Sequence, residues 1–506
     1  MFKKISLTVV VFLLFFLVLE MVCHFLESRL TASVSSEPSS PGWQTEFFSS
    51  LFDWHEPDPV LLWRFKPNLN NPLIKTNSAH FIGEEVSKKK DPRTYRIMVL
   101  GDSSPVGLGL DSCKQAFAEI LQVLLNQQYP GKEIEVVNAA VSGYTSEQVT
   151  RFMDSEGWSY APDLVLVYCG NNDASVSGDR SDRELMRRQQ VAGMRQVLSR
   201  LAFYRVLRDV ITGFSKADNA EPGILNVRVT PEQYEENLRQ LARQAHGRNC
   251  SVIVIKPAVP YLWPAGLQFK IFTHVTGDEG RLILPPRMVE ILGRQVKYCL
   301  DENRFRSLYG RGDKFTRAVY ASAYNDGMSP EQAVAFYERL LADDSGNAVI
   351  CNNLGVSWWA EGDFDRAGKL LRKARALYCE NLCPGVDSIA ERAAGSPFLY
   401  NLGINLLTRM SRDSSLTGDR DDSALIYLDS ALQADFFSLR IKKTYWRAID
   451  KLKAENLVEI LELPALFGDN GSERLFIDHC HPTIEGHRLI AGALFDKIVA
   501  SGFIRP

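Results

Sequence analysis

Five short apolar segments, separated by stretches with helical periodicity, constrain the fold of this chain more than any other feature. They span residues 96–100, 134–137, 164–168, 252–256 and 458–463. Apolar runs of this length without alternation are typical of strands buried on both faces of a parallel sheet. Strands that alternate with helices form parallel α/β sheets. We therefore predict an α/β domain with a five-stranded parallel sheet.

The starts of three helices can be predicted between and after these strands. Ser112 and Gln115 have the spacing of a capping box ahead of an apolar helical face. Thr230, followed by Pro and Glu, predicts the start of another helix, which Gly247 should end. Pro482 is expected to begin the terminal helix.

The fifth apolar segment follows the fourth only after residues 257–457, which is far longer than a normal crossover connection. We predict an inserted helical module over residues 301–440. Residues 353–374 have the residue spacing of a tetratricopeptide helical hairpin. Residues 320–340 fit the same pattern, and residues 401–431 fit it if 411–422 form an insertion between two helices. The alternative is a helical insertion without repeats, with small residues at helix contacts.

The N-terminus has the features of a membrane anchor. Lys3 and Lys4 precede an apolar stretch over residues 5–26, which is long enough to cross a bilayer as a helix. A cleavable signal peptide is the alternative, but no clear small-residue cleavage site follows. The two lysines place residues 1–4 in the cytoplasm and the rest of the chain outside it, in the periplasm if the source is a Gram-negative bacterium. Residues 27–93 are expected to be a spacer and N-terminal extension.

Polar residues follow the predicted strands at their carboxyl ends, where parallel sheets bind ligands. The first strand is followed by Gly101-Asp102-Ser103 and the second by Ser142-Gly143-Tyr144. The third is followed by Asn171-Asn172-Asp173, and a block from Asp478 to Pro482 follows the fifth. We expect these four blocks to meet at one edge of the sheet.

The residue types in these blocks suit acyl transfer. Ser103 can act as a nucleophile if a neighbouring base takes its proton, and His481 is the candidate base. Asp478, three residues earlier, can fix the tautomer of the imidazole and stabilise the imidazolium. The backbone N–H groups of Ser103 and Gly143 and the side-chain amide of Asn172 can stabilise an oxyanion, each by about 3 kcal/mol.

The four blocks, in this order, resemble those of the SGNH hydrolases, also called the GDSL esterase and lipase superfamily. The resemblance covers residues 94–300 and 441–506. It implies a three-layer flavodoxin-like domain, a catalytic triad and an oxyanion hole, formed by Ser103, Asp478, His481, Gly143 and Asn172. Ser104 stands where the family name has leucine, and the helical insertion is the main departure.

Other classes of function are less compatible with the sequence. The net charge of −3 and the absence of a basic cluster argue against nucleic-acid binding. A metal site is conceivable in the region that holds Asp478, His479, Cys480, His481 and His487. Its spacing matches no zinc-finger pattern, and a triad accounts for Asp478 and His481. We expect no metal and no cofactor.

The cysteines allow two interpretations. Cys379 and Cys383 are close enough in sequence to form a bridge in an oxidising compartment. Cys169, Cys250 and Cys299 lie in or beside apolar segments, which favours buried reduced thiols.

Together these features predict a membrane-anchored, extracytoplasmic serine esterase that hydrolyses an acyl or acetyl ester of a small molecule or glycan. The acyl group would be carried on Ser103. The resemblance also implies a second function, O-acetyl transfer to a cell-surface or exported polysaccharide. A third possibility is an anchored scaffold that binds a protein partner through its helical repeats.

Overall fold

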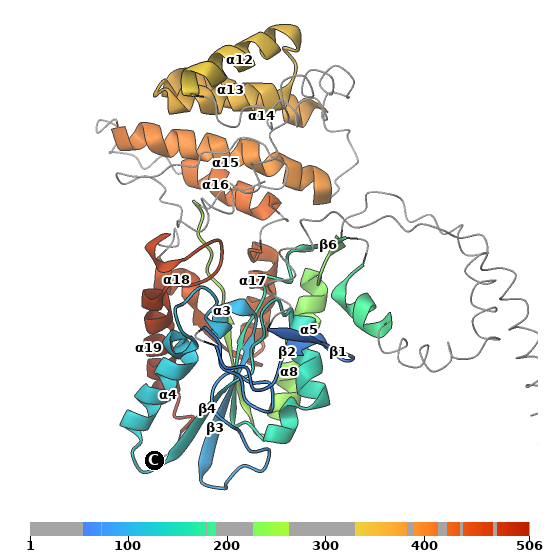
Figure 1. The fold of residues 1–506 in the computed structure, drawn as a ribbon, viewed down its shortest axis with the longest axis vertical. Coiled ribbons are helices and arrows are strands. Elements are labelled where there is room, and N and C mark those ends of the chain that lie inside the picture. The colour runs from blue at the N-terminus through green and yellow to red at the C-terminus, as the bar shows by residue number, and fades with distance from the viewer. Residues whose placement is uncertain are drawn as a thin grey trace, which may run out of the picture. The chain divides into compact units, whose positions relative to one another are not determined.

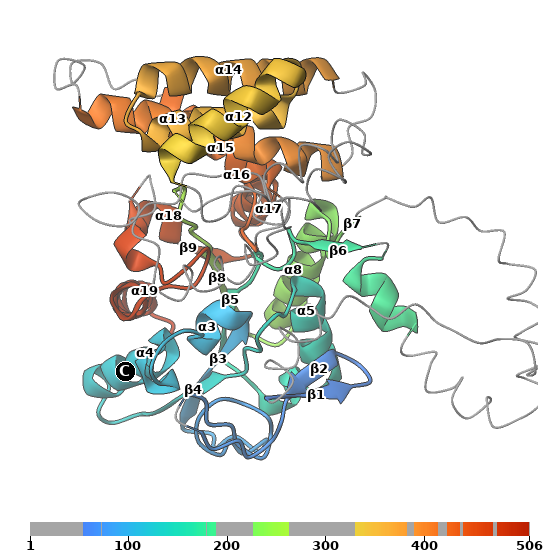
Figure 2. The same cartoon turned by 45° about the horizontal axis from the view of Figure 1, so that its top comes forward.

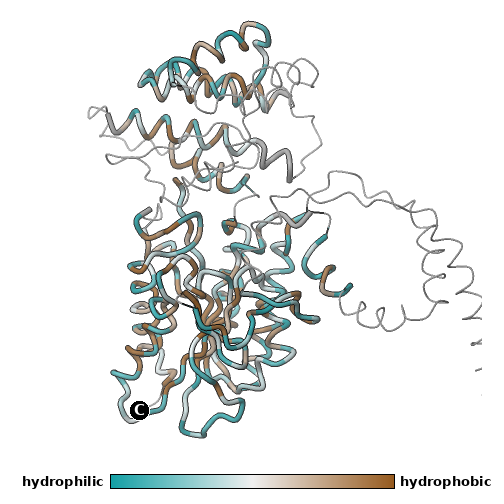
Figure 3. Tube along the Cα trace, viewed as in Figure 1, coloured by the Kyte–Doolittle hydropathy of each residue, from teal (hydrophilic) through white to brown (hydrophobic). Residues whose placement is uncertain are grey.

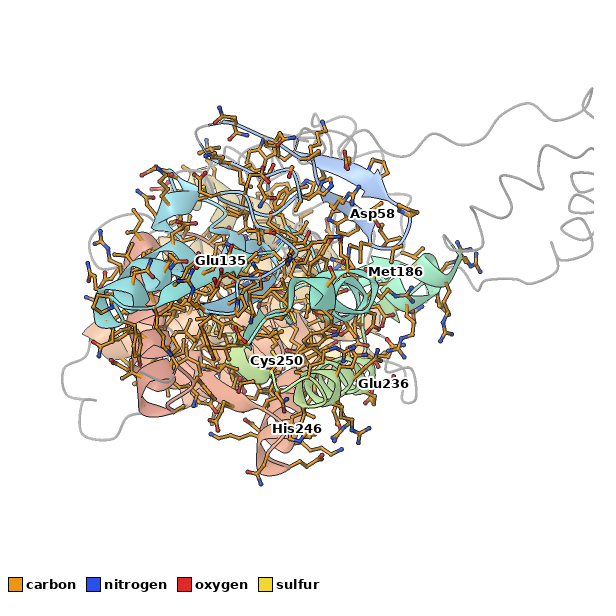
Figure 4. The ribbon with its side chains drawn as sticks, turned by 90° about the horizontal axis from the view of Figure 1, so that it is seen from below. Asp58, Glu135, Met186, Glu236, His246 and Cys250 are labelled. Carbon is orange, nitrogen blue, oxygen red and sulfur yellow. The ribbon has the colours of Figure 1, made fainter. Side chains whose placement is uncertain are left out.

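The computed structural model describes residues 54–71, 73–178, 180–188, 226–262, 329–381, 389–412, 423–435, 439–468 and 473–504. The chain divides into two units, one of residues 1–66 and 182–223 and the other of residues 67–181 and 224–506. In the first unit, β1 (His55–Asp58) and β2 (Leu62–Phe65) form an antiparallel hairpin. Residues 182–188 of this unit are helical, and the side chain of Met186 in this helix is buried. Met186 and Asp58, which belongs to the hairpin, are labelled in Figure 4.

The second unit contains a five-stranded parallel sheet, which confirms the prediction from the apolar segments. Its strands run in the order β4-β3-β5-β8-β9 (Figure 2). Their bounds are β3 (Thr94–Gly101), β4 (Glu133–Asn138), β5 (Leu164–Tyr168), β8 (Ser251–Lys256) and β9 (Glu459–Glu462). The chain moves from β3 to one neighbour, β4, and then to the other, β5. The strand order therefore reverses beside β3, and such a switch point is where open α/β sheets bind ligands.

Helices cover both faces of this sheet, so the domain has three layers. Figures 1 and 2 show α4 (Phe117–Gln128) and α19 (Ile484–Ala500) on one face. On the other face are α5 (Ser146–Ser155), α8 (Pro231–His246) and α17 (Lys443–Ala454). The apolar sheet residues form the hydrophobic centre visible in Figure 3. Side chains of α4 and α19 pack against it, among them Phe117, Leu121, Leu125, Ile490 and Leu494.

The end of the sheet away from the strands' carboxyl termini is closed by polar contacts. Arg96 on β3 forms an ion pair of 2.6 Å with Glu135 on β4, and Arg96 is buried. Glu135 is labelled in Figure 4. Asp163, just before β5, accepts the backbone N–H of Arg96 at 2.7 Å. The four polar blocks follow the strands at the opposite, carboxyl end of the sheet.

Two of the predicted helix boundaries need correction. Ser112 caps a single 3₁₀ turn over Cys113–Gln115, and α4 begins later, at Phe117. The backbone N–H of Phe117 instead donates to Nδ1 of His487 at 3.1 Å, so the cap comes from another helix. The terminal helix begins at Ile484 with Thr483 as its N-cap, which places Pro482 before the helix.

The third predicted boundary is confirmed. Thr230 is the N-cap of α8, and its hydroxyl accepts the N–H of Gln233 at 3.3 Å. The Gln233 side chain accepts the N–H of Thr230 at 3.1 Å, which completes a capping box. The helix ends at His246, directly before Gly247.

Between β8 and β9 the chain forms a group of helices, as predicted for the insertion. They are α12 (Pro330–Asp343), α13 (Ala348–Ala360), α14 (Phe364–Asn381), α15 (Ile389–Arg412) and α16 (Ser423–Ala434). Two helix pairs make the same close contact. A Cβ atom on Gly355 would lie 2.9 Å from Cγ of Leu371, and one on Gly403 would lie 2.8 Å from Cγ of Leu428. The tetratricopeptide assignment itself stays a prediction, and residues 320–324 of its first unit lie outside the described residues.

Several other predictions also fall outside the described residues, among them the cytoplasmic stub 1–4, the anchor 5–26, Cys299 and Cys383. Within the ranges given above, no helix combines the length and the apolar character that a bilayer span requires. Cys169 and Cys250 are buried free thiols, and Cys379 is an exposed free thiol.

Candidate active site

Ser103 stands at the tight turn that follows β3. Gly101 has a φ of 152°, and a Cβ atom there would lie 1.9 Å from the carbonyl oxygen of Tyr168, so this position requires glycine. The next residue, Asp102, is the N-cap of the short helix α3 (Ser103–Val106), and its carboxylate accepts the N–H of Ser104 at 2.8 Å. The turn places Ser103 at the carboxyl end of β3, between the ends of β4 and β5, with 8% of its surface exposed.

The loop before α19 places Asp478 and His481 against this serine. Oδ1 of Asp478 accepts the backbone N–H groups of Cys480 at 3.0 Å and of His481 at 2.9 Å. Oδ2 of Asp478 lies 2.7 Å from Nδ1 of His481. Nε2 of His481 lies 2.7 Å from Oγ of Ser103. The structure thus brings the three predicted residues into one continuous chain of hydrogen bonds.

Asp478 and His481 change each other's protonation. Burial alone raises the pKa of the Asp478 carboxyl, but the charges of His481 and His479 hold this pKa well below its usual range. Burial alone lowers the pKa of His481, but the Asp478 carboxylate raises it well above the ordinary value of 6.5. Asp478 therefore stays ionised, accepts the N–H at Nδ1 and leaves Nε2 to take the proton of Ser103.

Gly143 lies in the turn that follows β4. The N–H of Tyr144 donates to the carbonyl of Val141 at 3.2 Å, and Gly143 has a φ of 83°. Positive φ at the third position of such a turn favours glycine. The N–H of Val141 donates to the carbonyl of Gly101 at 3.1 Å, which joins this loop to the end of β3 beside Ser103.

Asn172 lies in the loop that follows β5, on the other side of β3. Its side chain is buried, and Nδ2 donates to the carbonyl of Tyr144 at 3.1 Å. An amide nitrogen carries two N–H groups, so this bond leaves one donor that can serve an oxyanion. Because the strand order is β4-β3-β5, the loops of Gly143 and Asn172 flank the loop of Ser103.

Two residues near the site have contacts that the sequence did not reveal. The carboxylate of Asp173 is fully buried and accepts two hydrogen bonds from Ser146, one from its backbone N–H at 2.9 Å and one from its hydroxyl at 2.5 Å. These bonds fix the start of α5 after the Gly143 turn. The hydroxyl of Ser104 lies 3.4 Å from the carbonyl of Cys480 and links the serine loop to the histidine loop. Both contacts join residues far apart in sequence, so no local pattern signals them.

The predicted cluster of metal-ligand types is only partly assembled. Ligand atoms of Asp478, His479 and Cys480 lie within 4.8 Å of one another. Both carboxylate oxygens of Asp478 already accept hydrogen bonds from this loop. His487 lies elsewhere, where its ring stacks on Phe117 with centroids 6.0 Å apart.

Comparison with known proteins finds a family match for part of the chain. Residues 99–271 match the model of the GDSL-like Lipase/Acylhydrolase family. This range holds Ser103, Gly143 and Asn172 but ends before Asp478 and His481, which only the fold brings to Ser103. The comparison with curated proteins finds no match.

Three solved structures illustrate the similarity. A lipase/acylhydrolase from Enterococcus faecalis is 20% identical, with 33% of this chain and 58% of that chain covered and a TM-score of 0.19. An acetylxylan esterase from Geobacillus stearothermophilus is 19% identical, with coverage of 40% and 70% and a TM-score of 0.20. A two-domain esterase active on acetylated mannans is 15% identical, with coverage of 32% and 30% and a TM-score of 0.20.

The matched range includes the end of β3, the strands β4, β5 and β8, and the helices α4, α5 and α8, so this part of the chain resembles a GDSL-like lipase/acylhydrolase domain. The helices α17 and α19 and the strand β9 lie outside the match. The chain spans less than two thirds of the length of two of the three solved structures, with 30% and 58% of those chains covered.

Proposed function

We propose that the protein hydrolyses a carboxylic ester through an acyl-enzyme on Ser103. The observation that carries this proposal is the hydrogen-bonded chain from Ser103 through His481 to Asp478, with both distances between side chains at 2.7 Å. An acyl or acetyl ester of a small molecule or a glycan is the substrate class that we propose.

In the first half-reaction, Oγ of Ser103 attacks the ester carbonyl carbon while its proton passes to Nε2 of His481. Asp478 stabilises the imidazolium that forms. The N–H groups of Ser103, Gly143 and Asn172 stabilise the oxyanion. When the tetrahedral intermediate collapses, the alcohol leaves with the proton from His481.

In the second half-reaction, water takes the place of the alcohol. His481 removes a proton from this water, the resulting hydroxide attacks the acyl carbon, and Ser103 leaves with the proton. A sugar hydroxyl can replace water in this step, and the product is then an O-acylated glycan. O-acetyl transfer to a polysaccharide is for this reason an alternative outcome of the same acyl-enzyme.

We further propose that this chemistry takes place outside the cytoplasm on an anchored protein. The support is the apolar stretch over residues 5–26 with Lys3 and Lys4 before it. Cell fractionation combined with protease accessibility of the intact chain tests this location. Protection of residues 94–506 by the membrane in intact spheroplasts would contradict it.

The catalytic proposal is tested by replacing Ser103 with Ala and measuring hydrolysis of p-nitrophenyl acetate. We expect turnover to fall to the background rate and labelling by a fluorophosphonate to disappear. The matched control is Ser155→Ala, which removes an exposed hydroxyl at the end of α5. Wild-type turnover in Ser103→Ala would overturn the proposal.

The same assay distinguishes hydrolysis from transfer. Oligosaccharide is added at increasing concentration, and released acetate and acetylated sugar are measured separately. Release of p-nitrophenol with an equal amount of free acetate supports hydrolysis, whereas acetylated sugar in excess of free acetate supports transfer.

A further inference from the structure

The two loops that carry Gly143 and Asn172 are joined by Arg228, a residue outside the four sequence blocks. We propose that Arg228 is a positioning residue that holds these loops at the separation that an oxyanion requires. The inference rests on the proposed function, because it concerns the reaction that Ser103 carries out.

The backbone of Arg228 is fixed to the loop of Asn172. Arg228 directly follows β7 (Asn226–Val227), which pairs antiparallel with β6 (Val176–Gly178). The N–H of Arg228 donates to the carbonyl of Ser175 at 2.8 Å, and the N–H of Val229 donates to the carbonyl of Asp173 at 3.2 Å. Arg228 therefore moves with the loop that supplies the Asn172 amide.

The side chain of Arg228 reaches the other loop. Its Nη1 donates to the carbonyl of Gly143 at 2.8 Å, and its Nη2 donates to Oε1 of Gln148 at 3.3 Å. Gln148 is part of the capping box at the start of α5, where the same Oε1 accepts the N–H of Thr145 at 3.1 Å. The guanidinium thus holds both the Gly143 turn and the first turn of the following helix.

The bond to Gly143 constrains the donor that the mechanism uses. The carbonyl and the N–H of Gly143 belong to adjacent peptide planes, and φ, which is 83° at this residue, sets their relative orientation together with ψ. Fixing the carbonyl therefore limits the directions in which the N–H can point. The bond from Asn172 to the carbonyl of Tyr144, at 3.1 Å, is a second link between the same loops. The bond from the Arg228 guanidinium to Gly143 is charge-assisted and is therefore the stronger of these two links, since the bond from Asn172 joins two neutral groups.

Arginine is suited to this position because its planar fork can donate to two acceptors at once. A lysine has a single ammonium group and cannot bridge Gly143 and Gln148 in the same geometry. Methionine has a similar length and no donor. Arg228→Lys should therefore lose one of the bonds to Gly143 and Gln148, and Arg228→Met should lose both.

The experiment compares wild type, Arg228→Lys and Arg228→Met as full-length protein. It measures kcat and KM for p-nitrophenyl acetate and the affinity for methylboronic acid, which forms a tetrahedral anionic adduct with a nucleophilic serine. Because oxyanion donors act mainly in the transition state, we expect a 10- to 100-fold lower kcat in Arg228→Met with KM changed less than threefold. The boronate affinity should fall by a similar factor, and Arg228→Lys should be intermediate.

The control variant is Arg239→Met on α8, which removes surface ion pairs with Glu235 and Glu455 and should leave kcat unchanged. Wild-type kcat and boronate affinity in Arg228→Met would overturn the inference. If that variant does not fold, the same wild-type values in Arg228→Lys would overturn it. Failure of the proposed function is distinguishable, because wild type itself would then neither turn over the ester nor react with a fluorophosphonate.

Discussion

Nε2 of His481 lies 2.7 Å from Oγ of Ser103, although 378 positions separate the two residues in the chain. The contact depends on two separate turns. Asp102 caps the short helix that presents Ser103, and Asp478 holds the loop of His481 through two backbone N–H groups. Each turn is formed by its own acidic side chain, so the geometry of the pair can be tested by changing one carboxylate at a time.

Asp478→Asn should lower kcat by about 10³- to 10⁴-fold, because an amide can hold His481 in the wrong tautomer and cannot stabilise the imidazolium. The side chain keeps its size, so the variant should fold. Steady-state hydrolysis of p-nitrophenyl acetate measures the change. A loss of less than tenfold would show that Asp478 acts only in folding the loop.

The pH dependence of kcat/KM should report His481. The ring must be neutral to accept the proton of Ser103, so activity falls as the pH decreases through its pKa. Because Asp478 raises this pKa above 6.5, the decline in wild type should begin above pH 6.5. In Asp478→Asn the carboxylate is gone, and the midpoint of the residual activity should move to lower pH. An unchanged midpoint would contradict the coupling of the two groups.

How far the sequence predicts this structure depends on whether a signal is local. The apolar segments predicted the five parallel strands because each is buried on both faces, and burial of that kind leaves a continuous apolar run. The helix start at Thr230 was predicted because its signal, a threonine followed directly by Pro231 and Glu232, is local. Ser112 was assigned wrongly to α4 because that helix is capped by His487, at a separation of 370 positions.

In the candidate site, too, only features with a local sequence signal could be predicted. The blocks that hold Ser103 and His481 could be predicted to converge because parallel strands end at one edge. The position of Arg228 could not be predicted, since its role depends on a backbone carbonyl, that of Gly143, which carries no sequence signal.

Gly143→Ala should lower kcat at least tenfold while costing about 1 kcal/mol of stability. The φ of 83° is unfavourable for a residue with a Cβ atom, so the turn must shift and take the N–H with it. The matched control is Gly131→Ala, where a Cβ atom would meet nothing within 4 Å. Kinetics and urea unfolding of both variants check this prediction, and wild-type kcat in Gly143→Ala would remove Gly143 from the oxyanion hole.

Asn172→Ala should lower kcat by about 10²- to 10³-fold with little change in KM, because the amide donor acts on charge that develops in the transition state. Asn126→Ala, which changes an exposed side chain on α4, serves as the control. Equal loss in kcat and rise in KM would instead indicate that Asn172 mainly binds the substrate or supports the Gly143 turn.

His487→Gln tests the long-range cap of α4. The amide oxygen of Gln can still accept the N–H of Phe117, but the stacked ring is lost, so the variant should be less stable at pH 7 by about 1–2 kcal/mol. Burial lowers the pKa of His487 to about 3, and the charge of His481 adds to this effect. The folded protein therefore excludes a proton that the unfolded chain binds below pH 6.5.

The free energy of unfolding of wild type should therefore decrease as the pH falls from 6.5 toward 3, because protons bind His487 only in the unfolded chain. The variant His487→Gln has no titrating group at this position and lacks this pH dependence. Other titrating groups are present in both proteins and cancel in the difference, including Asp102, whose pKa burial raises to about 6. Urea unfolding of the two proteins at pH 7 and pH 4.5 should consequently show a smaller gap at the lower pH. A gap that stays constant would mean that His487 is protonated in the folded protein or reaches solvent, and the cap would then have to be assigned to another group.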